Sequence, residues 1–335
     1  MMQINRLHAQ AILLALGMLF LGSQGVAQVV GRYSGEFMAA GAGARSQGLG
    51  GAAAASSGEP WSLFFNPAGL ASVDRAQLGL MHSERFAGVV DYDAVAFSMP
   101  HEANQTLTVG MLRLGVNGIP FTTLEYPDQP MGDANRIEVD KYVNDGEYAF
   151  YLAKAGRWDN AAGWINDLGL SWGVAPKLIF KHIGSYRHYG LGLDAGLMKH
   201  WEGAPLFAVG FAVRDLLGTL IKSEKTGRTE VIVSTFRLGG SVMLPLPVLE
   251  ADFTILADGA YRTESIGEKE AFEYHAGAEY LVRKILALRA GSDNGELTFG
   301  GGLAFKLVSI DYAFIGHDDL GDTHRISLTA RWGRF

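Results

Sequence analysis

GAGARSQGLGGAAAASSGEPWSLFFNPAGLAS, residues 41–72, is the stretch that decides how this chain folds. Small residues dominate it until the aromatic cluster and the Asn-Pro-Ala-Gly turn near its end. Glycine reaches positive φ and alanine adds little bulk, so such a backbone folds tightly in a confined space. The stretch therefore predicts a plug, or hatch, inside a hollow structure. The residues assigned to it are Arg45, Gly48, Gly50, Gly51, Trp61, Phe64, Phe65, Asn66, Pro67, Ala68 and Gly69.

The chain begins with the features of a secretory signal peptide, which we assign to residues 1–27. Arg6 supplies the positive charge, residues 9–21 form an apolar run, and Gly-Val-Ala at 25–27 offers small residues for cleavage. A short membrane anchor is the alternative interpretation of this segment. The sequence has no cysteine, so neither a lipoprotein nor a disulfide framework is expected. Export without cysteine is typical of the bacterial cell envelope.

Composition narrows the class of protein without deciding it. The net charge is −7 and no basic block occurs, which argues against nucleic acid as a partner. After the signal, no apolar run approaches the ~20 residues of a membrane-spanning helix. Glycine accounts for 44 of 335 residues, while only 19% are charged and 11% aromatic. These values suit a membrane β-barrel, and they also suit a soluble all-β protein.

Alternation with a period of two residues recurs from about residue 76 to the end of the chain. Within 206–214, for example, large apolar side chains at odd positions alternate with mostly small ones at even positions. This pattern is typical of strands that face lipid on one side and a lumen on the other. We predict fourteen antiparallel strands in a closed transmembrane barrel over 76–335, with 28–75 as the plug. The predicted strands are 76–84, 91–100, 105–116, 146–155, 167–182, 186–200, 206–214, 229–244, 248–258, 271–282, 284–291, 296–306, 308–315 and 323–334.

The lengths of the predicted connections favour a membrane barrel over a soluble sandwich. The long ones, 117–145, 215–228 and 259–270, all follow odd-numbered strands, and 156–166 is the exception. With both termini in the periplasm, odd connections face outward, where longer loops are usual. Aromatic residues gather at both predicted rims, as in aromatic girdles. They are Trp158, Trp164, Trp201 and Trp332 at one rim, and Tyr142, Tyr148, Tyr186, Tyr189, Tyr261 and Tyr274 at the other.

The last strand, THRISLTARW at 323–332, is predicted to close the barrel and to carry its assembly signal. Its apolar phase runs through Ile326, Leu328 and Trp332. Phe335 is out of that phase, so residues 333–335 are expected to be a short extension. The residues assigned to barrel closure are Thr323, His324, Arg325, Trp332 and Phe335.

Three motifs together resemble the PorV/PorQ family of Bacteroidetes-type outer-membrane proteins. They are GARSQGLGGAAAA at 43–55, FFNPAGLA at 64–71 and the closing THRISLTARW. That family is similar to the FadL long-chain fatty-acid transporters, which are fourteen-stranded barrels with an N-terminal hatch. The run Ala-Ala-Ala-Ser-Ser-Gly at 53–58 departs from the family, whose members often carry Val and acidic residues there.

The resemblance implies a non-enzymatic protein of the bacterial outer membrane with no cofactor. Its first implied role is type IX-like protein secretion or surface attachment, with outer-membrane lipid, secreted cargo proteins and secretion-machinery subunits as partners. The alternative is FadL-like transport of hydrophobic small molecules. That alternative calls for a continuous apolar pocket beside Trp61, Phe64 and Phe65, and for a lateral gap in the wall.

Other candidate chemistry is weak. There is no Gly-x-Ser-x-Gly motif, and Gly-Leu-Gly-Gly at 48–51 lacks the Lys-Ser/Thr of a phosphate loop, so no catalytic residue is assigned. The 117–145 connection is the expected site for a protein partner. Carboxylates in the 317–324 loop suit Ca²⁺, but a solvated turn is the simpler interpretation, and we expect no metal. This loop contains His317, Asp318, Asp319, Asp322 and His324. Inside the barrel we expect ion pairs between two groups of residues: Glu250, Asp252, Glu273, His275 and Glu279 with Lys177, Lys181, Arg214 and Arg237.

Overall fold

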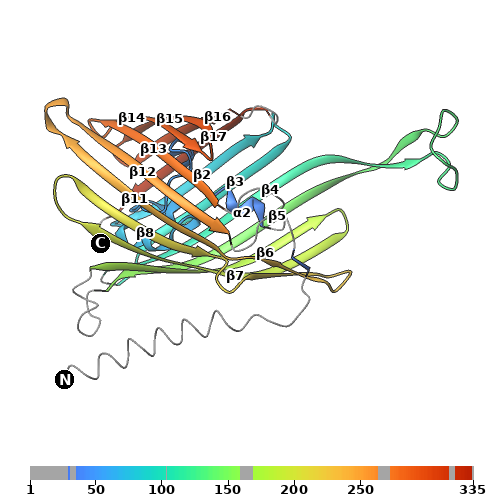
Figure 1. Ribbon diagram of the computed structural model, residues 1–335, viewed down its shortest axis with the longest axis horizontal. Helices are drawn as coiled ribbons and strands as arrows, with labels where there is room; N and C mark the ends of the chain where they lie inside the picture. The colour runs from blue at the N-terminus through green and yellow to red at the C-terminus, as the bar shows by residue number, and fades with distance from the viewer. Residues whose placement is uncertain are drawn as a thin grey trace, which may run out of the picture.

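The computed structural model describes residues 29–30, 35–102, 104–158, 169–262, 272–316 and 321–333. Fourteen strands form a closed antiparallel barrel, in which the last strand pairs with the first along its whole length (Figure 1). The prediction of a fourteen-stranded antiparallel barrel is confirmed. The barrel strands are β2 (Ala76–Arg85), β3 (Val90–Pro100), β4 (Gln105–Leu124), β5 (Ile137–Arg157), β6 (Leu170–Ile183), β7 (Tyr186–Trp201), β8 (Leu206–Arg214), β11 (Thr235–Leu246), β12 (Ala251–Arg262), β13 (Phe272–Val282), β14 (Leu286–Asp293), β15 (Glu296–Phe305), β16 (Val308–Ile315) and β17 (Thr323–Trp332).

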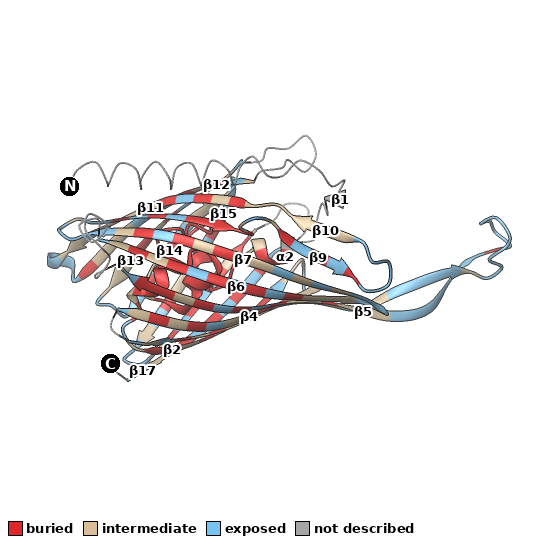
Figure 2. Ribbon diagram, turned by 90° about the horizontal axis from the view of Figure 1, so that it is seen from below, coloured by how far each residue is buried: buried red, intermediate tan, exposed pale blue. Residues whose placement is uncertain are grey.

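Burial alternates along the wall strands, as Figure 2 shows in its bands of red and pale blue. On β8 the side chains of Phe207, Val209 and Phe211 are exposed, whereas Ala208 and Ala212 are buried inside. The outer face thus carries the large apolar side chains, the arrangement that a barrel wall needs in lipid. Among the described residues no helix is both long and apolar enough to cross a membrane.

The hairpin of β4 and β5 corrects the prediction of a loop over 117–145. Both strands continue far beyond the barrel, pairing as far as Leu124 with Ile137, so that only the tip between them is a loop. Figure 1 shows this ribbon, which we call the arm, as a long projection from one end of the barrel. Alternating β-branched and charged residues over 137–140 favour a strand, but Gly118 and Pro120 obscured the pattern on β4. The pairing shifts register near these two residues.

The wall is kinked where the prediction placed one strand over 229–244. The structure instead has β10 (Thr229–Ile232) before β11, and β9 (Thr219–Ser223) lies within the predicted 215–228 loop. β9 pairs with β7 and β10, and β10 also pairs with β1 (Val29–Val30). The break between β8 and β9 contains Asp215 and Leu217, both at positive φ. The pairing of β7 with this part of the wall is therefore interrupted between β9 and β8.

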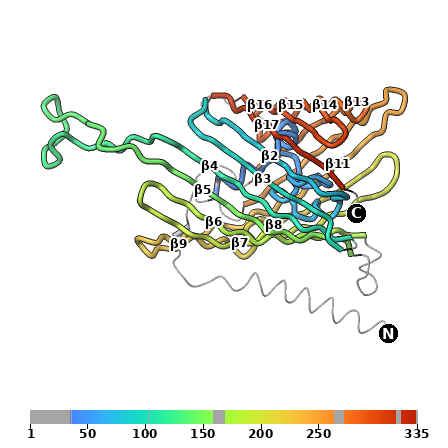
Figure 3. The backbone as a smooth tube through the Cα atoms, turned by 180° about the vertical axis from the view of Figure 1, so that it is seen from behind, coloured from blue at the N-terminus to red at the C-terminus, as the bar shows by residue number. Residues whose placement is uncertain are grey.

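Residues 35–75, which we call the plug, lie inside the barrel (Figure 3). The plug contains α2 (Glu36–Ala39), α3 (Ala44–Gly48), η1 (Pro60–Phe64) and η2 (Pro67–Ser72). Proline stands at the start of both η1 and η2, where its missing N–H does no harm. α3 contacts the wall from β14 to β17, η1 contacts β2 to β4, and η2 contacts β4 to β7.

The wall carries glycine where the plug backbone comes closest. A Cβ added at Gly277 would overlap the backbone of Leu49, and one at Gly210 would overlap the carbonyl oxygen of Ala54. A Cβ at Gly173 would overlap the backbone of Pro67. The small residues of the plug and the glycines of the wall therefore meet main chain to main chain.

Gly277→Ala should displace the plug near Leu49, because the new methyl group would meet backbone that no side-chain rotation can move. We expect a loss of about 1–3 kcal/mol in unfolding free energy, as for overpacking of a core. Denaturant unfolding of the refolded protein measures this loss of unfolding free energy. Gly301→Ala is the matched control, since its nearest neighbour, the carbonyl oxygen of Ala287, is at an ordinary 3.8 Å. Equal stability of the two variants would contradict the direct contact.

Candidate functional site: the plug in the barrel lumen

Asn66 holds the plug turn to both the plug and the wall. Its side chain is completely buried, and its Oδ1 accepts a hydrogen bond from the N–H of Ala68 at 3.1 Å. This bond caps η2. Its Nδ2 donates to the carbonyl oxygens of Ala54 at 2.7 Å and of Leu197, on β7, at 3.2 Å. One side chain thus satisfies two buried carbonyls and one helix N-terminus.

Asn66→Ala is expected to lower the unfolding free energy by about 2–3 kcal/mol, because it leaves buried backbone groups without partners. The measurement is the denaturation midpoint in detergent. Asn144→Ala is the control, since the exposed Asn144 accepts one bond, from the N–H of Gly118. A variant at Asn66 as stable as this control would show that the plug turn does not depend on the amide.

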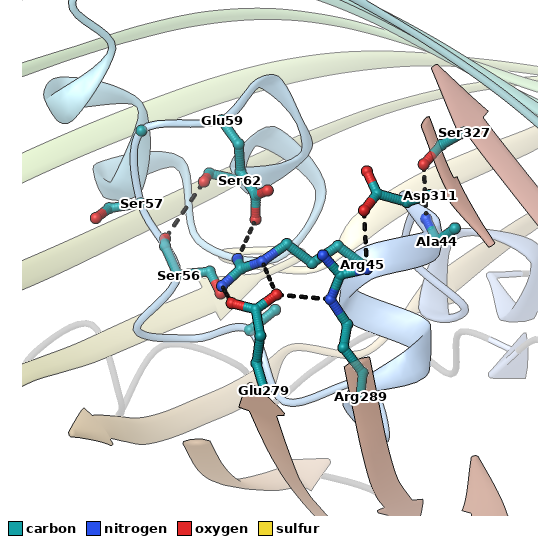
Figure 4. Close-up of polar contacts among 12 residues, drawn as sticks. Ala44, Arg45, Ser56, Ser57, Glu59, Ser62, Glu279, Arg289, Asp311 and Ser327 are labelled. Atoms are coloured by element: carbon teal, nitrogen blue, oxygen red, sulfur yellow. Dashed lines mark hydrogen bonds and ion pairs between the residues drawn. The ribbon is translucent and has the colours of Figure 1, made fainter. Parts of the chain in front are cut away.

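Arg45 ties α3 to the wall through a chain of ion pairs (Figure 4). Its Nε and Nη2 donate to the two carboxylate oxygens of Glu279, on β13, at 3.0 and 2.8 Å. Its Nη1 lies 3.2 Å from Glu59 of the plug. Arg289, on β14, also donates to Glu279 at 2.6 Å, and it forms an ion pair with Asp311, on β16, at 2.8 Å. Bidentate, charge-assisted contacts of this kind are the strong ones among hydrogen bonds.

The guanidinium of Arg45 stays protonated in the lumen. Burial alone would lower the pKa of its guanidinium, but Glu279 and then Glu59 raise that pKa above its ordinary value. The plug therefore carries a permanent cation that the wall neutralises.

The expected interior ion pairs form with different partners. Glu279 pairs with Arg45 and Arg289, Lys181 with Glu147, and Arg237 with Asp258. The prediction for Glu250 is wrong: it precedes β12 in a left-handed turn and pairs with exposed Arg283 outside the lumen. The remaining predicted residues lie as follows: Lys177 with Asp194 and Asp215, His275 with Asp293, Glu273 with Arg262, Arg214 against the carbonyls of Met38 and Ala39, and Asp252 in a cavity wall.

Sequence reasoning missed Arg289 and Asp311. Both stand on inward positions of predicted strands, so their alternation phase was an available signal. The missing information was which strands lie beside α3.

Two cavities flank the plug. One, of about 510 Å³, lies at the end away from the arm and is lined in part by Arg45, Glu59 and Trp61. The other, of about 340 Å³, lies toward the arm end and is lined in part by Phe65 and Arg325. Plug residues line both cavities, so the plug lies between them.

The continuous apolar pocket expected beside the plug aromatics is absent from the described residues. Trp61, Phe64 and Phe65 are only 2%, 3% and 4% exposed and belong to the packed core of the plug. Phe64 meets the wall residue Tyr151 edge to face at 5.3 Å. The lumen is therefore closed here, and the two cavities beside it have mixed polar and apolar walls.

The residues assigned to barrel closure lie on both faces of β17. Thr323 and Arg325 are buried in the lumen, whereas His324 contacts Tyr312 at 2.8 Å and Trp332 stacks on Phe97. Phe335, Trp164 and the loop residues His317, Asp318 and Asp319 lie outside the described residues, as does 1–27. Asp322 is exposed. Within the described ranges, no group of three or more His, Asp or Glu side chains is placed to hold a metal ion.

Solved structures of hydrocarbon channels and transporters share this fold. The toluene transporter TbuX of Ralstonia pickettii has 12% sequence identity and a TM-score of 0.55, covering 88% of this chain and 99% of that chain. The monoaromatic hydrocarbon channel CymD has 13% identity and a TM-score of 0.59, covering 91% and 100%. The toluene transporter TodX of Pseudomonas putida has 12% identity and a TM-score of 0.53, covering 87% and 96%.

The class that these observations define is a fourteen-stranded β-barrel with an internal plug, and it has the fold of these channels and transporters. At such low identities the likeness establishes the fold alone. No protein-family model and no curated protein matches the sequence. The neighbours support the barrel fold that the resemblance implied, and they give no support to the PorV/PorQ assignment.

Proposed function

We propose that this protein is an outer-membrane channel through which small, largely apolar molecules pass when the plug moves. The observation that carries the proposal is a lumen with a cavity on each side of the plug, of about 510 and 340 Å³. Ligand sites of similar size are common in proteins. The fold of channels for toluene and monoaromatic hydrocarbons supports apolar cargo.

The attachment of the plug suits movement as a unit. Polar contacts through Arg45 and Asn66 hold it, its backbone rests on wall glycines, and Phe64 packs against the wall residue Tyr151. The break between β8 and β9 supplies the other element, because the pairing of both with β7 is interrupted there. A passage beside the plug therefore needs broken polar contacts but no unfolding of the barrel.

Uptake of radiolabelled toluene by cells that express the protein tests the proposal. We expect faster initial uptake than in cells expressing an unrelated outer-membrane barrel at the same level. The toluene concentration must be low enough that diffusion through the lipid does not mask uptake through the channel. Equal rates in the two strains would contradict a channel for hydrocarbons.

Secretion or surface attachment of proteins is the second candidate, and the arm favours it. Near the tip of the arm Met131, Ile137 and Tyr142 are 70%, 59% and 68% exposed, which offers apolar contacts to a protein partner. Replacing residues 119–142 by a two-residue Asn-Gly turn separates the two functions. Loss of secreted proteins with unchanged toluene uptake would favour secretion, and unchanged secretion would exclude this role for the arm.

A further inference from the structure

Arg325 is a buried cation without a partner in the described part of the chain. It lies on β17 with 1% of its surface exposed, and neither its Nε nor its Nη1 has a hydrogen-bond acceptor. The hydroxyl of Thr323, two residues earlier on the same face, is also buried and unpartnered. Both residues line the cavity of about 340 Å³ at the arm end. Unpaired groups of this kind are costly, so each calls for an explanation.

A second guanidinium group, that of Arg85, shares an aromatic neighbour with Arg325. The guanidinium carbons of Arg325 and Arg85 lie 5.5 and 5.8 Å from the ring centre of Tyr92, and both residues line the cavity. An aromatic face attracts a cation but does not replace a counter-charge.

The acidic side chains near this cavity are engaged elsewhere. Asp293 lies 2.9 Å from His275 and accepts a bond from Gln47, and Glu273 pairs with Arg262. Arg237, also in the cavity wall, pairs with Asp258. Among the described residues of the lining, Glu296 is the remaining acid, and it makes contacts of its own. Within this described part of the chain, the cluster around Arg325 therefore has surplus donors and positive charge.

We infer that this cavity binds the carboxylate of a small organic acid, with Arg325 and Thr323 as hydrogen-bond donors and Arg85 as a second cation. A guanidinium is the usual protein partner of a carboxylate, because its planar donors match the two oxygens. Phe65, Ile315 and the alanines at 39 and 40 form an apolar part of the wall for the body of the acid. A purely inorganic anion would leave these apolar walls unused.

This inference rests on the proposed channel function and adds organic acids with an apolar body to the neutral hydrocarbons as its cargo. The cavity lies at the arm end, where the connection lengths predict the outer face. An acid entering from outside would therefore reach this site before it meets the plug. Binding does not require the plug to move, so it is measurable apart from transport.

Isothermal titration of the full-length protein in detergent tests the inference, with benzoate, toluene and inorganic phosphate as probes. We expect benzoate to bind, and Arg325→Gln to weaken this binding about tenfold or more. Thr323→Val removes the hydroxyl at nearly constant volume and should weaken binding by a smaller factor. Arg331→Gln is the matched control, because Arg331 lies on the same strand but lines the opposite cavity.

Thermal stability gives a second readout that a structural role would not reproduce. Without ligand, Arg325→Gln should melt at the same temperature as the wild type or higher, because it removes an unpaired buried charge. Benzoate should raise the melting temperature of the wild type and of Arg331→Gln only.

Three results would contradict the assignment of this binding site. They are no benzoate binding by the wild type, benzoate binding by Arg325→Gln as tight as by the wild type, or a melting temperature of that variant below the wild type without ligand. If the protein bound toluene or phosphate in preference to benzoate, the assignment of an organic acid as the ligand would be wrong. Failure of toluene uptake with benzoate binding intact would count against the channel and leave the site standing.

Discussion

Lys177→Met should lower the free energy of unfolding by about 3–5 kcal/mol, as expected when one partner of a buried ion pair is removed. The Nζ of Lys177 lies 2.7 Å from Asp194 and 2.8 Å from Asp215, and its side chain is 1% exposed. Without the ammonium, two carboxylates face each other away from water. The hydroxyl of Thr219 donates a hydrogen bond to Asp215 at 2.5 Å, but it is uncharged and therefore neutralises neither carboxylate.

The effect should be local to the kink between β8 and β9. The backbone N–H of Asp215 donates to Asp194, so the ion pairs fix the residue at which the pairing with β7 is interrupted. Hydrogen exchange should show faster exchange in β9 than in β17. The matched control is Lys181→Met on the same face of β6, whose pair with Glu147 is partly exposed and should contribute about 1 kcal/mol or less. Equal losses for the two variants would show that the kink does not depend on Lys177.

Arg45→Ala should loosen the plug while leaving the barrel folded. It removes the bidentate contact with Glu279 and the contact with Glu59, and charged hydrogen bonds of this kind contribute about 2 kcal/mol. A change of that size raises the population of the open plug about 30-fold. Glu279 keeps Arg289 as its partner, so the wall itself remains paired.

Single-channel conductance in planar bilayers measures this opening. We expect rare, brief openings for the wild type and frequent ones for Arg45→Ala, with an unchanged denaturation midpoint of the barrel. Arg75→Ala is the control, because Arg75, the last residue of the plug, pairs with its exposed sequence neighbour Asp74. If both variants conduct like the wild type, the Arg45 contacts do not hold the plug shut.

The barrel was predictable because its signal is local. Period-two alternation depends only on neighbouring residues, and the predicted strand over 206–214 matches β8 to the residue. The kink was not predictable, since it depends on Lys177, Asp194 and Asp215 meeting across three segments. The arm was missed because glycine and proline interrupt its alternation on β4.

The candidate site was predictable in part. The composition of residues 41–72 indicated an element packed in a lumen, and Asn66 indicated its turn. The partner of Arg45 was not predictable, because Glu279 is 234 positions away in the sequence and its register decides the contact. The unpaired state of Arg325 is likewise a property of the assembled lumen. Its inward phase on β17 was readable from sequence, but the absence of a counter-charge was not.

The claim that passage requires the plug to move is tested most directly by locking the plug. The sequence has no cysteine, so a pair introduced by Ala44→Cys and Ser327→Cys would form a disulfide without competitors. These residues are buried neighbours: the N–H of Ala44 donates to the hydroxyl of Ser327 at 3.1 Å. Each single-cysteine variant serves as a control. Initial toluene uptake should fall to background in the oxidised double variant and recover after treatment with dithiothreitol. If the cross-linked protein takes up toluene as fast as the dithiothreitol-treated protein, the account is contradicted.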